Sequence, residues 1–139
     1  MSETPISGSC LCGTVTFAVS PPFMKMVHCH CERCRKSSGT GHATNIIASV
    51  DGFRWLTGEE AIRRYDLPDA KSFSKWFCSD CGCPVPRKSR AGNWLVIPAG
   101  SLDSEPEMAP TDRIFWASRA AWSCDAGGLP THDEYPDSW

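Results

Sequence analysis

The sequence predicts a small, mainly β domain. Short segments with alternating apolar and polar residues recur along the chain, and eleven glycines and eleven prolines interrupt them. No long amphipathic helical pattern is present. The chain has 139 residues, which is the size of one domain. We therefore expect a single domain over residues 1–139 and an irregular tail over residues 124–139, where Gly, Pro and Asp are frequent.

The first expected strand covers residues 14–19. Val15, Phe17 and Val19 alternate there with smaller or polar neighbours, which is the period of a half-buried strand. Two prolines at positions 21 and 22 end this segment. The pattern predicts one apolar face directed at the core.

The second expected strand covers residues 24–31 and returns toward the first. Because side chains alternate along a strand, Cys29 and Cys31 would share one face, and His28 and His30 would point to the other. This arrangement argues against a common metal site for these cysteines and histidines.

A short helical turn is expected at residues 32–38, with Gly39 ending it. A helix would bring Cys34 next to Cys31, since these residues are three positions apart. The two cysteines could then bind one metal ion.

The rest of the chain indicates further short strands. Asp51 and Gly52 form a turn signal between two of them, and residues 59–66 are ambiguous between strand and helix. The expected strands have apolar, β-branched or aromatic composition and cover residues 43–50, 53–56, 72–77, 93–97 and 113–116.

Composition limits the classes of function. The formal net charge of -2 gives no general attraction for nucleic acid. No apolar run is long enough to span a bilayer, so we expect no membrane partner. The first residues lack the basic and apolar regions of a secretory signal, which predicts a cytoplasmic protein. Nine cysteines in a reducing compartment indicate metal ligands rather than disulfides.

Seven of these cysteines form groups with the spacing of metal ligands. We interpret two pairs, C-x-C near the start and C-x-x-C downstream, as one structural zinc site with four thiolates: Cys10, Cys12, Cys78 and Cys81. The third group, C-x-C-x-x-C, has one ligand fewer than zinc usually takes: Cys29, Cys31 and Cys34. Spacing alone does not make the pairing unique, and the fourth ligand of the second site could be solvent, Cys83, Cys124 or a histidine.

The ordered motifs resemble the glutathione-dependent formaldehyde-activating enzyme family, which includes centromere protein V. The resemblance rests on residues 8–13, 29–36, 77–82 and 118–122. It implies an ordered core over about residues 8–122, a zinc-stabilised fold similar to the Mss4-like (β-tent) fold, and two zinc ions per chain. It assigns the four-cysteine set to a structural zinc, and it makes Cys29, Cys31 and Cys34 the catalytic zinc site.

The resemblance also implies a reaction class. The protein would be a zinc-dependent carbon–sulfur lyase that forms or cleaves S-hydroxymethyl thiol adducts, with glutathione as co-substrate and formaldehyde or a related aldehyde as partner. Arg33 and Arg35, with Lys36 beside them, could hold a glutathione carboxylate or offset the charge of the thiolates. His28 and His30 could move protons, but neither is assigned a catalytic role.

A non-catalytic, zinc-stabilised interaction module is the alternative, because fold does not determine function. Nucleic-acid binding ranks third, since it would need a clustered basic face and only residues 33–36 and 87–90 offer one. A closed second metal site would favour the interaction module, and an open one would favour the enzyme.

Overall fold

A computed structural model of the chain describes residues 4–123 and 127–138. Its strands, in chain order, are β1 (Ile6–Ser9), β2 (Thr16–Val19), β3 (Phe23–Cys29), β4 (Ala43–Ser49), β5 (Phe53–Thr57), β6 (Ile62–Asp66), β7 (Ser74–Cys78), β8 (Arg87–Lys88), β9 (Trp94–Pro98) and β10 (Asp112–Ile114). One α-helix, α1 (Glu32–Ser38), accompanies them, with five short 3-10 turns at Val50–Gly52, Glu59–Ala61, Ala99–Ser101, Trp116–Ser118 and Ala121–Ser123. The prediction of a small, mainly β domain is confirmed.

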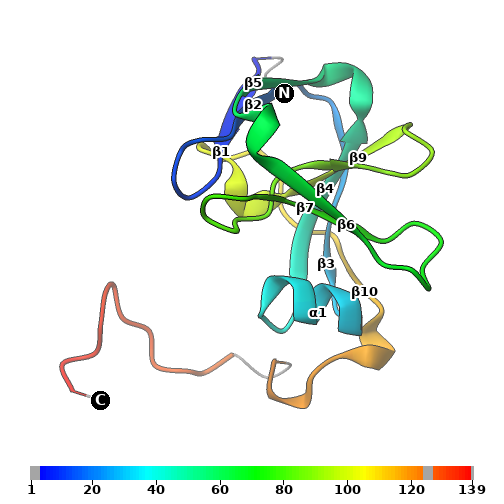
Figure 1. The fold of residues 1–139 in the computed structure, drawn as a ribbon. Helices are drawn as coiled ribbons and strands as arrows, with labels where there is room; N and C mark the ends of the chain where they lie inside the picture. The colour runs from blue at the N-terminus through cyan, green and yellow to red at the C-terminus, as the bar shows by residue number, and fades with distance from the viewer. Residues whose placement is uncertain (1–3, 124–126, 139) are drawn as a thin grey trace.

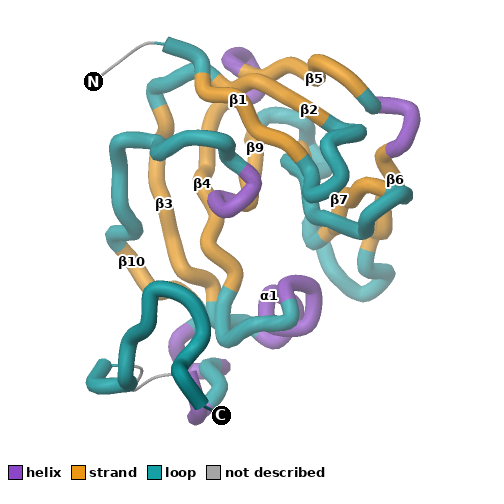
Figure 2. Tube along the Cα trace, turned by 90° about the vertical axis from the view of Figure 1, so that its left-hand side faces the viewer, coloured by secondary structure: helices purple, strands orange, loops and turns teal. Residues whose placement is uncertain are grey.

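The strands form three sheets (Figures 1 and 2). The largest has the order β10-β3-β4-β9-β8, the second has the order β1-β2-β5, and β6 pairs with β7 in the third. Most pairs are antiparallel, but β10 runs parallel to β3. Helix α1 lies beside the end of β3 and the start of β4 in both views.

The main core lies between the largest sheet and the β1-β2-β5 sheet. Phe17 of β2 is fully buried against Ile46 of β4 and against Leu95 and Ile97 of β9. Burying a side chain of this size contributes about 1.5–3 kcal/mol. The alternation expected at Val15, Phe17 and Val19 therefore matches a buried face, since all three are at most 1% exposed.

The chain leaves β3 earlier than the alternation indicated. The expected strand over residues 24–31 ends at Cys29, and Cys31 instead becomes the N-cap of α1. The backbone N–H of His30 donates to the carbonyl of Ile114 in the neighbouring β10, at 2.9 Å. Strand pairing therefore continues for one residue while the chain turns into the helix.

The short helix itself agrees with the expectation for residues 32–38. The backbone N–H of Cys34 donates to the Cys31 sulfur at 3.3 Å, which satisfies one donor of the first turn. Gly39 ends the helix with φ +73°, a left-handed conformation that glycine adopts at little cost. The ambiguous residues 59–66 divide into a 3-10 turn followed by β6.

Two strands lacked a usable signal in the sequence. β1 contains Ser7, Gly8 and Ser9, which are weak strand formers, and β8 has only two residues. Both exist because a neighbouring strand offers a ladder of backbone partners.

The described part of the tail, residues 127–138, contains no helix or strand. None of the helices that the structure describes has the length and hydropathy needed to cross a membrane.

Candidate metal centres

The first cysteine group joins two segments that are far apart in the chain. Cys10 and Cys12 lie in the loop after β1, Cys78 ends β7, and Cys81 lies in the turn that follows. The four sulfur atoms all lie within 4.8 Å of one another. Cys12 and Cys78 are separated by 66 positions, yet their sulfurs are 3.8 Å apart. This group therefore ties the start of the fold to its middle.

The geometry of this group fits a tetrahedral zinc ion. A zinc ion with four sulfurs at 2.3 Å requires sulfur–sulfur distances of about 3.8 Å, and the Cys10–Cys12 and Cys12–Cys78 distances are 3.7 and 3.8 Å. The backbone N–H of Val15 donates to the Cys10 sulfur at 3.2 Å, as expected for a thiolate acceptor. Zinc is thus compatible with the donors that are present.

Backbone donors also favour the charged form of one thiol in this group. Hydrogen bonds from the backbone of Cys83 and Cys12 lower the pKa of Cys81 to about 6. Burial raises the pKa of Cys78 to about 11. A bound cation would favour the thiolate at both positions.

The second group lies where β3 meets α1. Cys29 is the last residue of β3, Cys31 caps the helix, and Cys34 lies in its first turns with its side chain buried. Their sulfurs lie within 4.8 Å of one another. A hydrogen bond from the Cys34 thiol is the main cause that lowers the pKa of Cys29 to about 6, and the same bond raises the pKa of Cys34.

This second group offers three candidate protein ligands within the described residues. No further Cys, His, Asp or Glu of the described chain joins it at ligand distance. Cys83 packs instead with Cys10, Cys78 and Val85, and its thiol lies 3.5 Å from the carbonyl oxygen of Pro84. Cys124, the other candidate for a fourth ligand, lies outside the described residues.

A pocket of about 550 Å³ opens directly beside the three cysteines. Small-molecule sites in proteins commonly have volumes of about 300–1,000 Å³. Cys29, Cys31 and Cys34 line one part of it, and the remaining lining is mostly apolar: Val27, Ile47, Phe73, Val96, Ile114 and Phe115, with the polar residues Glu32, Arg33, Asn45, Ser72 and Arg87. A small ligand in this pocket would therefore lie beside the three cysteines.

The two arginines named from the sequence have different positions. Arg33 lines the pocket, whereas Arg35 is not among its lining residues. The Nε atom of Arg35 is buried and has no hydrogen-bond partner among the described residues. Arg33 is consequently the better placed of the two to meet a ligand in this pocket.

The structure adds two cations that the sequence did not single out. Arg87 of β8 lines the same pocket, and Lys75 of β7 lines a narrow cavity together with Arg87 and Cys34. Arg87 was noted only as part of a basic run, and Lys75 lay inside an expected strand. Nothing in the local pattern marks either residue, because their approach to the cysteines depends on strand pairing.

The histidines form a cluster of their own. The ring of His42 lies 4.0 Å from that of His28 and 5.0 Å from that of His30, measured between centroids. His30 is 2% exposed and also packs edge-on against Trp116. None of these imidazoles joins either cysteine group among the described residues.

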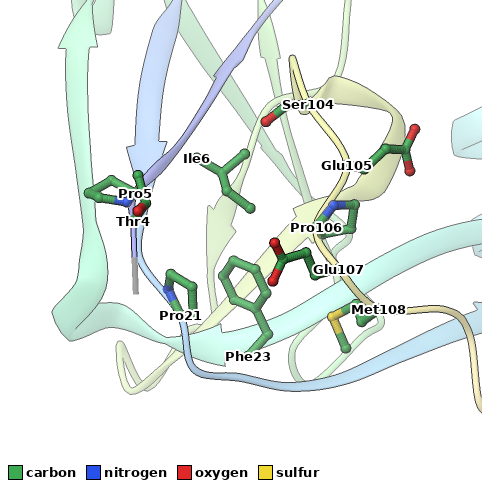
Figure 3. A pocket seen from close by; sticks show the side chains of 10 residues that line it. All are labelled: Thr4, Pro5, Ile6, Pro21, Phe23, Ser104, Glu105, Pro106, Glu107 and Met108. Carbon is green, nitrogen blue, oxygen red and sulfur yellow. The ribbon is translucent and has the colours of Figure 1, made fainter. Parts of the chain in front are cut away.

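A different cavity lies at the opposite end of β3. It has a volume of about 210 Å³ and lies between the start of β1, the start of β3 and residues 104–108 (Figure 3). Phe23, which lines it, is six residues from Cys29, or roughly 20 Å along the strand. Its lining contains no thiol and no imidazole, so it is not part of the candidate centre.

Two comparisons with known proteins bear on the family and the fold of this chain. The chain matches the family model described as "Glutathione-dependent formaldehyde-activating enzyme" over residues 5–118. It is also similar to a crystal structure of a Rhodobacter sphaeroides protein, with 22% sequence identity and a TM-score of 0.62. That similarity covers 78% of this chain and 99% of the other, and at this identity it shows a common fold.

Proposed function

Because the chain belongs to the glutathione-dependent formaldehyde-activating enzyme family, we propose that it forms or cleaves S-hydroxymethyl thiol adducts. Glutathione is the proposed thiol, and formaldehyde or a related aldehyde is the proposed carbonyl compound. The observation that carries the proposal is the group Cys29, Cys31 and Cys34, which has three ligands and faces a pocket. Catalytic zinc sites commonly have three protein ligands and an exchangeable fourth position.

The proposed reaction is balanced without a further reactant. A bond forms between the thiol sulfur and the carbonyl carbon, and the thiol proton is transferred to the carbonyl oxygen. Cleavage is the reverse. A zinc ion at the three cysteines would supply a position where the incoming thiol loses its proton and remains nucleophilic.

The chain's own residues supply binding and orientation. Arg33 lines the pocket and can pair with a glutathione carboxylate. Val27, Ile47 and Val96 form an apolar wall beside the cysteines, which limits the water that reaches the reacting atoms. We infer that the reacting sulfur lies against the cysteines and that the carboxylates of glutathione lie toward the arginines.

Phe115, which lines this pocket, supports a ligand-binding role for it. It has φ +55° and is 63% exposed, although a non-glycine residue in this conformation is strained by roughly 1 kcal/mol or more. Because its side chain is exposed, Phe115 gains little free energy from burial that could offset this strain. Contact with a bound ligand would account for its position.

NMR spectroscopy of the reaction mixture tests the proposed activity. Glutathione and ¹³C-formaldehyde are mixed with the zinc-loaded protein, and the rates of adduct formation and breakdown are compared with those in buffer. We expect acceleration by wild type and by Cys83→Ser, which leaves both cysteine groups intact. We expect none with Cys31→Ser. No acceleration by wild type would refute the enzymatic proposal and favour a zinc-stabilised interaction module.

Native mass spectrometry tests the metal content of the same samples. Wild type and Cys83→Ser should each carry two zinc ions, and Cys31→Ser should carry one. A wild type with one ion, or a Cys31→Ser protein that retains two, would contradict two separate sites.

A further inference from the structure

Two cationic side chains line cavities that are also lined by residues of the three-cysteine centre. Lys75 projects from β7 and Arg87 from β8, and both line a cavity of about 20 Å³ together with Cys34. A cavity of this volume accommodates about one water molecule, so it cannot hold a substrate. Arg87 additionally lines the large pocket with Cys29 and Cys31. Cys34 is thus the thiol that lines this small cavity together with both cations.

Neither cation forms an ion pair with a carboxylate of the described chain. Ion pairs within the described residues join Lys25 to Asp112, Lys36 to Glu32 and Arg64 to Asp66, and the one carboxylate that lines the large pocket is Glu32.

The guanidinium of Arg87 lies 5.3 Å from the ring centroid of Phe73, a contact that leaves its N–H donors without an anion. Partly buried charges are costly unless something compensates them.

The thiolates are the groups that can compensate these charges. Burial lowers the pKa of Lys75 and that of Arg87, and the neighbouring Arg87 lowers the pKa of Lys75 further. Cys34 acts in the opposite direction on both, and Cys83 also does so on Lys75. Cys29 acts on Arg87 in the same sense as Cys34. A negative charge at the cysteines thus favours the charged forms of both side chains.

We propose that Lys75 and Arg87 are the cationic partners of the Cys29, Cys31 and Cys34 centre and that they make its fourth position select an anion over a neutral ligand. The ligand class is a thiolate or another small anion. This inference rests on the proposed function, because it requires a divalent ion bound by Cys29, Cys31 and Cys34.

The selectivity follows from formal charge. Three thiolates around a divalent ion carry one net negative charge. With the two cations the centre has one net positive charge, and a bound anion makes it neutral. Without them, an anion would be added to a site that is already negative, which Coulomb repulsion opposes in a partly buried position.

Cobalt-substituted full-length protein provides the test, because the absorption of Co²⁺ bound to thiolates responds to its fourth ligand. Azide serves as the anionic probe and imidazole as the neutral probe, titrated at constant ionic strength. The variants are Lys75→Met and Arg87→Met, with Lys75→Arg and Arg87→Lys as conservative replacements. Lys88→Met is the matched control, since Lys88 is exposed on the same strand as Arg87.

Azide affinity should fall at least tenfold in each methionine variant, while imidazole affinity changes by less than about twofold. The conservative replacements and Lys88→Met should retain the preference for azide. Zinc affinity at the three-cysteine centre, measured against a chelator, should fall about 10–100-fold in the methionine variants. If these variants do not fold, Lys75→Gln and Arg87→Gln provide the same comparison.

Two outcomes would overturn the inference: an unchanged azide preference in the folded variants, or equal losses of azide and imidazole affinity, which would indicate a merely structural role. A wild type that binds both probes equally would refute the selectivity and leave the proposed function intact. Failure of wild type to bind a second metal ion would refute the proposed function itself.

Discussion

The four-cysteine group should stabilise the fold more than the three-cysteine group does, because it closes a much longer loop. Cys12 and Cys78 are 66 positions apart, and the loop-closure relation for covalent cross-links gives about 4 kcal/mol for such a loop. Cys29 and Cys34 are five positions apart, for which the same relation gives about 2 kcal/mol. The expected difference between losing one site and losing the other is therefore about 2 kcal/mol.

Matched variants isolate this difference. Cys12→Ser/Cys81→Ser and Cys31→Ser each leave two thiolates at the affected site, and none of the replaced side chains is fully buried. Urea unfolding of zinc-loaded protein, followed by tryptophan fluorescence, should show losses of about 4 and about 2 kcal/mol in the free energy of unfolding.

Excess chelator provides the control. Without zinc, wild type and both variants should agree to within about 1 kcal/mol, since the cross-links are then absent from all three. Equal losses in the two zinc-loaded variants would refute the loop-closure argument. So would a wild type whose stability does not change when zinc is removed.

Three further changes have defined expectations. Gly58→Ala should lower the free energy of unfolding, measured in urea, by more than about 2 kcal/mol, because φ is +77° and a Cβ would overlap the carbonyl oxygen of Thr14. Gly92→Ala is the control: φ is +79° but the space around it is open, so the free energy of unfolding should fall by about 1 kcal/mol. In zinc-free protein, the rate of Cys81 alkylation by iodoacetamide should rise with pH around a midpoint of about 6, since hydrogen bonds favour its thiolate. Peptide mass mapping measures this rate, and a midpoint near the ordinary thiol pKa would contradict the expectation. Phe115→Gly should relieve backbone strain of about 1 kcal/mol or more in urea unfolding and raise the KM for glutathione in the exchange assay, whereas an unchanged KM would exclude contact with the substrate.

Local features of the fold and the site were predictable from the sequence. The spacing of Cys29, Cys31 and Cys34 needs only a strand end and one helical turn to bring the sulfurs together, and both are local structures. Gly39 ended the helix where expected, because a left-handed C-terminal residue is a local requirement.

Positions that depend on partners far along the chain were less predictable. The expected strand over residues 24–31 was too long at its C-terminal end, since the hydrogen bond of His30 to Ile114 and the cap of α1 end it after Cys29. The sequence alone also did not indicate β1, because Gly8 and its serine neighbours become a strand only beside β2.

The sequence by itself predicted the two groups of cysteines that could bind metal ions, because residue type and short spacing restrict what thiolates can bind. Only the tertiary structure decided that Cys83 lies with the four-cysteine group, that Arg33 rather than Arg35 lines the pocket, and that Lys75 and Arg87 line a cavity with Cys34. The physical reason is that strand register brings together residues that are far apart in the chain, and the local sequence around each of them does not indicate which partner it will contact.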